Sequence, residues 1–264
     1  MIQNKAALNF KIYPPEAQAV GQFDGGRITE VKPIGFPHEG PPIKNLGPLF
    51  YWAWATAKGY GKIALHPHQA FEIMSYALEG EIGHYDSLGN RSRVQAGGAQ
   101  VIQAGAGISH EEETIGEFTD FFQIWFDPNI RKTIHNNPTY NEFKNDDFLI
   151  EHQDGVTLKT ILGNGSPIYL ESEVIMQDIS IENDRLYQYV LAQDRTLAVV
   201  IISGKGILFD KQTGAKHHVN KQDFAVIHAK QRGEISIQAD SSSPLRIATI
   251  EVPAQVDYPL YRNQ

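Results

Sequence analysis

The chain has 264 residues and a formal net charge of −8 at pH 7, with 41% hydrophobic and 10% aromatic residues. That length allows one large β domain or two of ordinary size, and the composition is that of a globular protein with a buried core. The acidic balance argues against a general nucleic-acid binder, which would carry a basic face. Because the sequence has no cysteine, a disulfide framework, thiolate ligands and a cysteine nucleophile are excluded.

No segment of the sequence approaches the run of apolar residues that spans a bilayer. The stretch from Met1 to Lys5 leads into no apolar run of signal-peptide length. We therefore expect a cytoplasmic protein that contacts neither membranes nor nucleic acids directly.

Strand signals dominate, because short alternating or β-branched segments are separated at close intervals by Gly, Asn, Asp and Pro. This pattern predicts an all-β chain built from antiparallel barrels or sandwiches. Short helices are expected only near 129–136 and at the extreme carboxyl end, because no stretch carries a long 3.6-residue apolar period. The predicted strands, in chain order, are 71–78, 100–103, 121–126, 158–162, 174–181, 197–202, 225–228 and 245–252.

Two pairs of metal-ligating residue types share a spacing of two residues. Side chains two apart on a strand project from the same face, so His66 and His68 can aim at one point. His110 and Glu112 can do the same from another strand. Together the pairs predict a site of three histidines and one carboxylate, with its other coordination positions left to water or substrate. Since imidazole suits Fe, Mn, Ni, Cu and Zn alike, the spacing does not choose the metal.

An internal repeat divides the sequence. Gly80 aligns with Gly204, and Gly98 with Asp223, each within a similar strand–turn–strand pattern and at an offset of 124 to 125 residues. Repetition on this scale predicts two copies of one domain. The stretch 127–154, rich in Asn, Asp and Pro, is the predicted linker.

The second copy lacks the four metal-type residues. The same offsets place Val190, Ala192, Ile235 and Ile237 at their positions, and three of these are β-branched residues typical of a core. We therefore predict that only the first half of the chain binds metal.

The metal pairs belong to a longer pattern. The sequence reads His-x-His-x3-Glu-x7-Gly from His66 to Gly80, and Gly-x6-Gly-x-Gly-x2-His-x-Glu from Gly98 to Glu112. This resembles the two-part cupin signature. More closely, HPHQAFEIMSYALEGEIGHYDSLGN followed by GGAQVIQAGAGISHEE resembles the pirin family. The match is specific over about residues 20–140.

The pirin resemblance implies two tandem cupin-type antiparallel barrels, a bicupin. The metal-binding barrel would span residues 1–140, and a second barrel without ligands would span 141–264. The resemblance also implies a single iron, while the spacing leaves Mn, Ni, Cu, Zn and Co open. The ligands that it implies are His66, His68, His110 and Glu112.

Some bacterial pirins cleave the flavonol quercetin, so the resemblance implies a metal-dependent dioxygenase that takes a phenolic or flavonoid substrate and O2. Glu112 would accept the proton of the substrate hydroxyl as a general base, with Glu72 as the alternative. The other function left open is a non-catalytic, iron-dependent redox sensor that recruits a protein partner, as described for animal pirins.

Several neighbouring residues carry simpler expectations. Glu72 is expected to orient a ligand imidazole from beside the site. Glu111 and Glu113 alternate with Glu112 and are expected to face solvent. His84 follows turn glycines and is expected to be exposed, and the aromatic run 50–54 is expected to pack in the core.

Overall fold

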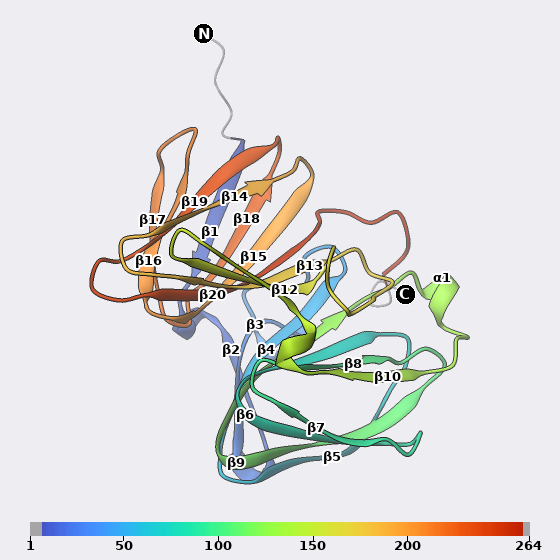
Figure 1. Cartoon of the computed structure of the whole chain (residues 1–264). Coiled ribbons are helices and arrows are strands. Elements are labelled where there is room, and N and C mark those ends of the chain that lie inside the picture. Colours follow the sequence, from blue (N-terminus) through green and yellow to red (C-terminus); the bar gives the residue numbers. More distant parts are fainter. Residues whose placement is uncertain (1–6, 261–264) are drawn as a thin grey trace. The chain divides into compact units, whose positions relative to one another are not determined.

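The computed structural model describes residues 7–260, and strands make up most of them (Figure 1). Two compact units divide the described chain. The first, which we call the histidine unit, comprises Ala17–Phe148, Pro167–Glu173 and 256–260. The second, the apolar unit, comprises 7–16, Leu149–Ser166 and Val174–Gln255. Each unit therefore takes segments from both halves of the sequence.

The histidine unit holds one antiparallel sheet of nine strands, in which β6 pairs with residues 110–126 of β9. Each of these long strands changes its second partner midway: β6 pairs with β8 and then β7, and β9 pairs with β5 and then β4. The strands are β2 (Ala19–Phe23), β3 (Ile28–Ile34), β4 (Leu49–Lys58), β5 (Gly61–His68), β6 (Glu72–Asp86), β7 (Arg91–Gln95), β8 (Ala99–Gln103), β9 (Ile108–Phe126) and β10 (Thr139–Phe143).

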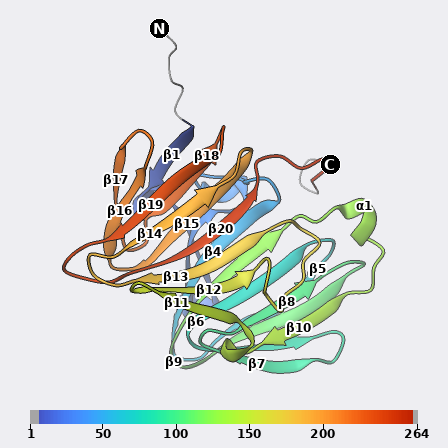
Figure 2. The same ribbon diagram turned by 45° about the horizontal axis from the view of Figure 1, so that its top comes forward.

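The apolar unit holds two antiparallel sheets, of seven and four strands (Figure 2). The seven-stranded sheet runs in the order β1 (Leu8–Tyr13), β18 (Phe224–Ala229), β15 (Arg195–Ser203), β20 (Leu245–Pro253), β13 (Ile175–Ile181), β12 (Val156–Leu162) and β11 (Leu149–Gln153). The four-stranded sheet runs in the order β14 (Leu186–Leu191), β19 (Gly233–Ala239), β16 (Lys205–Asp210) and β17 (Lys216–Asn220).

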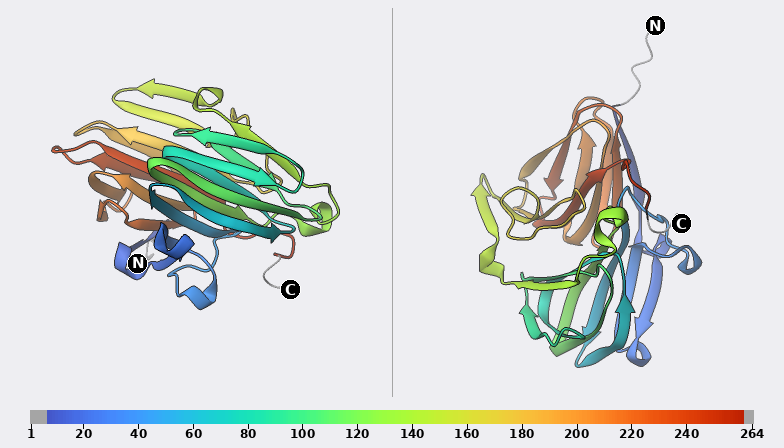
Figure 3. Two further views of the ribbon diagram at one scale, coloured as in Figure 1. Left: turned by 90° about the horizontal axis from the view of Figure 1, so that it is seen from below. Right: turned by 90° about the vertical axis from the view of Figure 1, so that its right-hand side faces the viewer.

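Helical structure is confined to short segments. The helix α1 (Ile130–Thr133) lies in the stretch where the sequence predicted one (Figure 3). Of the predicted carboxyl-terminal helix, residues 255–260 are not helical and 261–264 lie outside the described residues. The 3-10 turns are η1 (Pro15–Ala17), η2 (Asp24–Gly26), η3 (Pro37–Glu39) and η4 (Asn145–Asp147).

The all-β, antiparallel prediction is confirmed, and every predicted strand overlaps an observed one. The predicted repeat is visible in the turns. Gly80 and Gly204 have φ angles of +74° and +78°, in the left-handed region that favours glycine. A Cβ there would lie 2.3 Å from the carbonyl oxygen of Phe118 in one unit and 2.0 Å from that of Pro244 in the other. Each unit thus requires glycine at this turn, both because the φ angle is positive and because there is no room for a Cβ.

Aliphatic side chains fill the core of the apolar unit. Ile235 and Ile237, which the repeat aligns with His110 and Glu112, are completely buried in it. Val190 is 46% exposed, so the expectation that it belongs to the core is wrong. Strand alternation explains the difference, because Tyr189 and Leu191 on either side of Val190 face the core instead.

Candidate metal centre

Strands β5 and β9 bring three histidines of the histidine unit together. Residues His66 and His110 are direct partners in the antiparallel register, and His68 lies two residues along β5. Their ring centroids are 4.5 to 4.9 Å apart. One ligand nitrogen from each of the three lies within 4.8 Å of the other two, which is close enough to share a metal ion. The predicted convergence of these three side chains is thus what the structure contains.

The nitrogens of this triad fit a metal ion. Within the part of the chain that the structure describes, His68 Nε2 and both nitrogens of His110 are buried without a hydrogen-bond partner. His66 Nδ1 lies 2.8 Å from the carbonyl oxygen of Ala64, which leaves Nε2 as its ligand atom. Buried polar atoms are almost always satisfied. A divalent ion that accepts nitrogen ligands would satisfy these atoms.

Two of the imidazoles are held in the form that ligates. Burial lowers the pKa of His68 to about 3, and the charges of His110 and His66 add to this effect. Burial likewise lowers the pKa of His110 to about 3, with further contributions from His66 and His84. Both rings are therefore neutral near pH 7, and a metal ion meets no competing proton there.

Glu112 lies at the next inward position of β9, but it is not part of the closely spaced histidine group. Its Oε1 accepts hydrogen bonds from Ser75 Oγ (3.0 Å) and Gln100 Nε2 (3.1 Å). Its Oε2 accepts one from Gln123 Nε2 (2.7 Å). Neutral donors thus hold the buried carboxylate, and its role as a fourth ligand stays a prediction.

The alternation of β9 explains which acidic residues face inward. His110 and Glu112 are buried, whereas Glu111 and Glu113 are partly exposed. Lys62 Nζ lies 2.9 Å from Glu111 on the outer face. The predicted division between inward and outward side chains is therefore confirmed.

Glu72 has a different role from the one expected. Its carboxylate is 1% exposed and accepts bonds from Gln103 Nε2 (3.0 Å) and from the backbone N–H groups of Glu171 (2.6 Å) and Ser172 (3.0 Å). The expectation that it orients a ligand imidazole is wrong. Glu72 instead anchors the segment Pro167–Glu173 within the histidine unit.

The prediction that His84 is exposed is also wrong. Its side chain is completely buried, its Nε2 lies 2.9 Å from Asp86 Oδ2, and its ring stacks on Tyr140 at 4.0 Å and 7°. The ring centroid lies 5.5 Å from that of His110. The sequence held the signal, because His84 and Asp86 show the same two-residue spacing that identified the ligands.

Aromatic side chains flank His68. Trp125 packs its ring edge-to-face at 4.9 Å from His68, and it stacks on Tyr51 at 4.6 Å and on Phe71 at 5.8 Å. Tyr51 belongs to the run 50–54, whose residues are all buried as predicted. Flat apolar surfaces therefore lie beside one of the three imidazoles.

A cavity of about 570 Å³ opens beside the triad, lined by His68 and by Phe71, Gly107, Ile108 and Ser109 among others. Sites for small organic ligands are commonly of this size.

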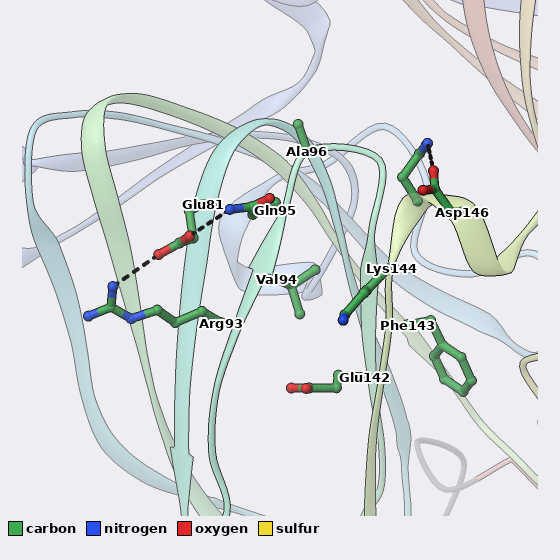
Figure 4. Close-up of a pocket in the computed structure, with 10 residues that line it drawn as sticks. Glu81, Arg93, Val94, Gln95, Ala96, Glu142, Phe143, Lys144 and Asp146 are labelled. Atoms are coloured by element: carbon green, nitrogen blue, oxygen red, sulfur yellow. Dashed lines mark hydrogen bonds and ion pairs between the residues drawn. The ribbon is translucent and has the colours of Figure 1, made fainter.

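A second cavity of about 510 Å³ lies against β7 and β10 (Figure 4). Its lining is strongly charged, with Arg93 3.3 Å from Glu81, and none of the three imidazoles contributes to it. Of these two cavities, only the first is lined by an imidazole of the triad. Within residues 7–260, no helix has the length and apolar character needed to cross a bilayer.

Residues 55–126, which include the triad, match the family model of pirin. Pirin-like protein 2 of Arabidopsis thaliana is 31% identical over 146 residues, which are 53% of this chain and 45% of that protein. A Pseudomonas aeruginosa protein named "Putative quercetin 2,3-dioxygenase" is 51% identical over 92 residues, 34% of this chain and 40% of that protein. The chain thus spans less than half the length of these two relatives.

The fold is also shared with solved structures. A bacterial pirin of Escherichia coli in complex with nickel(II) superposes with a TM-score of 0.75 at 22% identity, covering 94% of this chain and all of that one. The chain is therefore similar to pirin over residues 55–126, and it shares the fold of this bacterial pirin.

Proposed function

We propose that the protein is a metal-dependent dioxygenase of phenolic compounds, with a flavonol of the quercetin type as substrate. One divalent ion, iron by family resemblance, would be held by His66, His68, His110 and Glu112. The observation that carries the proposal is the meeting of three imidazoles within 4.8 Å, with buried nitrogens that lack partners in the described chain. The name of the Pseudomonas relative supports the choice of substrate.

The chemistry that a bound divalent ion supplies is stabilisation of a deprotonated hydroxyl and close placement of two reactants. The protein's own part begins with Glu112. A carboxylate oxygen has two acceptor positions. In the described structure Gln100 donates to Oε1 and Gln123 donates to Oε2, while the one hydroxyl proton of Ser75 can reach either Glu112 Oε1 (3.0 Å) or Gln123 Oε1 (2.7 Å). The remaining position on Oε2 can take a metal bond or the proton of the substrate hydroxyl, but only one of them at a time.

The surroundings of His68 suit a flat aromatic substrate. The cavity beside the triad, about 570 Å³, is large enough for a molecule with several rings. Phe71 lines that cavity and stacks on Trp125, which in turn contacts His68. Offset stacking between aromatic rings contributes roughly 0.5–1.5 kcal/mol beyond the area that it buries. We infer that Phe71 orients the substrate ring.

The proposal is tested by mixing metal-loaded protein with quercetin under nitrogen and then admitting air. Loss of the flavonol absorbance together with release of carbon monoxide is the expected result. His110→Ala should abolish both, whereas His135→Ala, which changes an exposed histidine, should leave both unchanged. Metal-loaded protein that shows neither change contradicts the dioxygenase. Metal binding without turnover would instead favour the metal-dependent binding module.

A further inference from the structure

His84 and Asp86 form a completely buried pair on β6. Asp86 is held from several sides: Oδ1 accepts the backbone N–H groups of Leu88 (2.9 Å) and Asn90 (3.0 Å), and Oδ2 accepts Asn90 Nδ2 (2.9 Å). His84 Nε2 completes this set, 2.9 Å from Oδ2. The position of the carboxylate is thus fixed by the turn that follows the strand.

This pairing determines which nitrogen of His84 carries the proton. A carboxylate can only accept, so Nε2 of His84 is the donor, and the Nδ1 of a neutral ring is then an acceptor. Nδ1 of His84 is buried and has no hydrogen-bond partner among residues 7–260. Stacking on Tyr140 at 4.0 Å holds the plane of the ring. His84 therefore presents an oriented, unused acceptor to the interior of the histidine unit.

The ligand imidazole whose ring lies near His84 is that of His110. Asp86 and His110 are partners in the register of β6 with β9, and the rings of His84 and His110 are 5.5 Å apart. An N–H···N bond of about 3 Å between two imidazoles places their ring centres roughly 5 Å apart. Neither nitrogen of His110 has a partner in the described structure. The observed separation of the two ring centres is close to this value, so the two imidazoles are near enough for such a bond.

A metal-ligating histidine almost always donates its second ring N–H to an acceptor, which fixes the ring and its tautomer. We propose that Asp86, His84 and His110 form a hydrogen-bonded chain in which His84 Nδ1 accepts the N–H of His110. His84 is thereby a positioning residue that determines which nitrogen His110 offers to the metal. This inference rests on the proposed metal site, and it extends that site to two further residues.

The test compares His84→Asn with His84→Leu. The two side chains have almost the same shape, but only asparagine can place an acceptor oxygen near the position of Nδ1. The measurement is the Kd for Ni²⁺, by competition with a chelator, together with the absorption spectrum of the Co²⁺-loaded protein. We expect His84→Leu to weaken Ni²⁺ binding roughly 10–100-fold and to alter the spectrum, whereas His84→Asn stays close to wild type.

The metal-free variants show whether His84 only fills space. A buried leucine should stabilise the fold at least as well as a buried asparagine, so denaturant unfolding should favour His84→Leu. Metal affinity is expected to follow the opposite order, which packing alone cannot produce.

Asp86→Asn tests the other end of the chain. Because two backbone N–H groups require an oxygen at the Oδ1 position, the amide nitrogen takes the Oδ2 position, where it donates to His84 Nε2 and Asn90 Nδ2 loses its acceptor. The ring proton then moves to Nδ1, and the acceptor for His110 is lost. Ni²⁺ binding should weaken as in His84→Leu. Equal Kd values for wild type, His84→Leu and Asp86→Asn would overturn the inference, whereas wild type that binds no Ni²⁺ would overturn the metal site itself.

Discussion

Replacement of Glu72 by glutamine should destabilise the histidine unit without touching the triad. In the wild type, Oε1 accepts Gln103 and the N–H of Glu171, and Oε2 accepts the N–H of Ser172. The amide oxygen of glutamine can replace only one of these oxygens, and the Oε1 position serves two donors. The amide NH2 then faces the N–H of Ser172. A buried donor left without an acceptor costs about 1–3 kcal/mol, so we expect a loss of about 2 kcal/mol in the free energy of unfolding.

Urea unfolding of metal-free protein measures this loss, and hydrogen exchange locates it. The amide of Ser172 should exchange faster in Glu72→Gln, because its opening no longer breaks a bond to a carboxylate. The matched control is Glu79→Gln, which changes an exposed residue of the same strand and should stay within about 0.5 kcal/mol of wild type. Unchanged unfolding midpoint and unchanged protection of Ser172 would refute the role of Glu72 as an anchor.

Three further predictions follow from the site and its turns. Between pH 6.5 and about 3, His68 and His110 bind protons in the unfolded chain but not in the folded protein, where they are buried. The free energy of unfolding of metal-free protein should therefore fall as the pH falls through this range. The decrease should be less steep in His110→Leu, which lacks one of the two groups. Ni²⁺ at a concentration a hundred times its Kd should raise the free energy of unfolding of the wild type by about 2.7 kcal/mol. The same Ni²⁺ concentration should not stabilise His66→Ala. Thermal unfolding with and without Ni²⁺ measures both effects. Both Gly80 and Gly89 have positive φ angles, but only at Gly80 would an added Cβ collide with the backbone. Urea unfolding should therefore show that Gly80→Ala lowers the free energy of unfolding by about 2–5 kcal/mol, and Gly89→Ala by about 1–2 kcal/mol. Equal costs for the two glycines would contradict the collision.

Much of the site could be predicted because strand alternation is a local rule. The two-residue spacing of His66 and His68, and of His110 and Glu112, puts each pair on one face wherever the strand lies in the sheet. The repeat could be recognised for the same reason, because the local conformation of each turn requires glycine at Gly80 and Gly204. The three histidines therefore converge as the sequence predicted.

The remaining features depend on the register in which the strands pair, and this register cannot be read from the sequence. His84 is buried because β6 pairs with β9 in the register that sets it opposite Glu112, and two bulges in that pairing shift its face. Glu72 meets Ser172 across 100 residues of sequence, a contact that no local pattern indicates. The predicted boundary places residues 8–13 in the metal-binding barrel, but the strand β1 that they form pairs with β18 in the apolar unit.

The interleaving of the two units has a consequence for how the protein can be divided. The histidine unit needs the segment Pro167–Glu173 and residues 256–260, and the apolar unit needs both β1 and β20. Neither unit can therefore be assembled in full from the first half of this sequence alone. A fragment cut after Phe148 would lack the segment whose backbone N–H groups donate to Glu72. A minimal metal-binding fragment should not be obtainable by simple truncation.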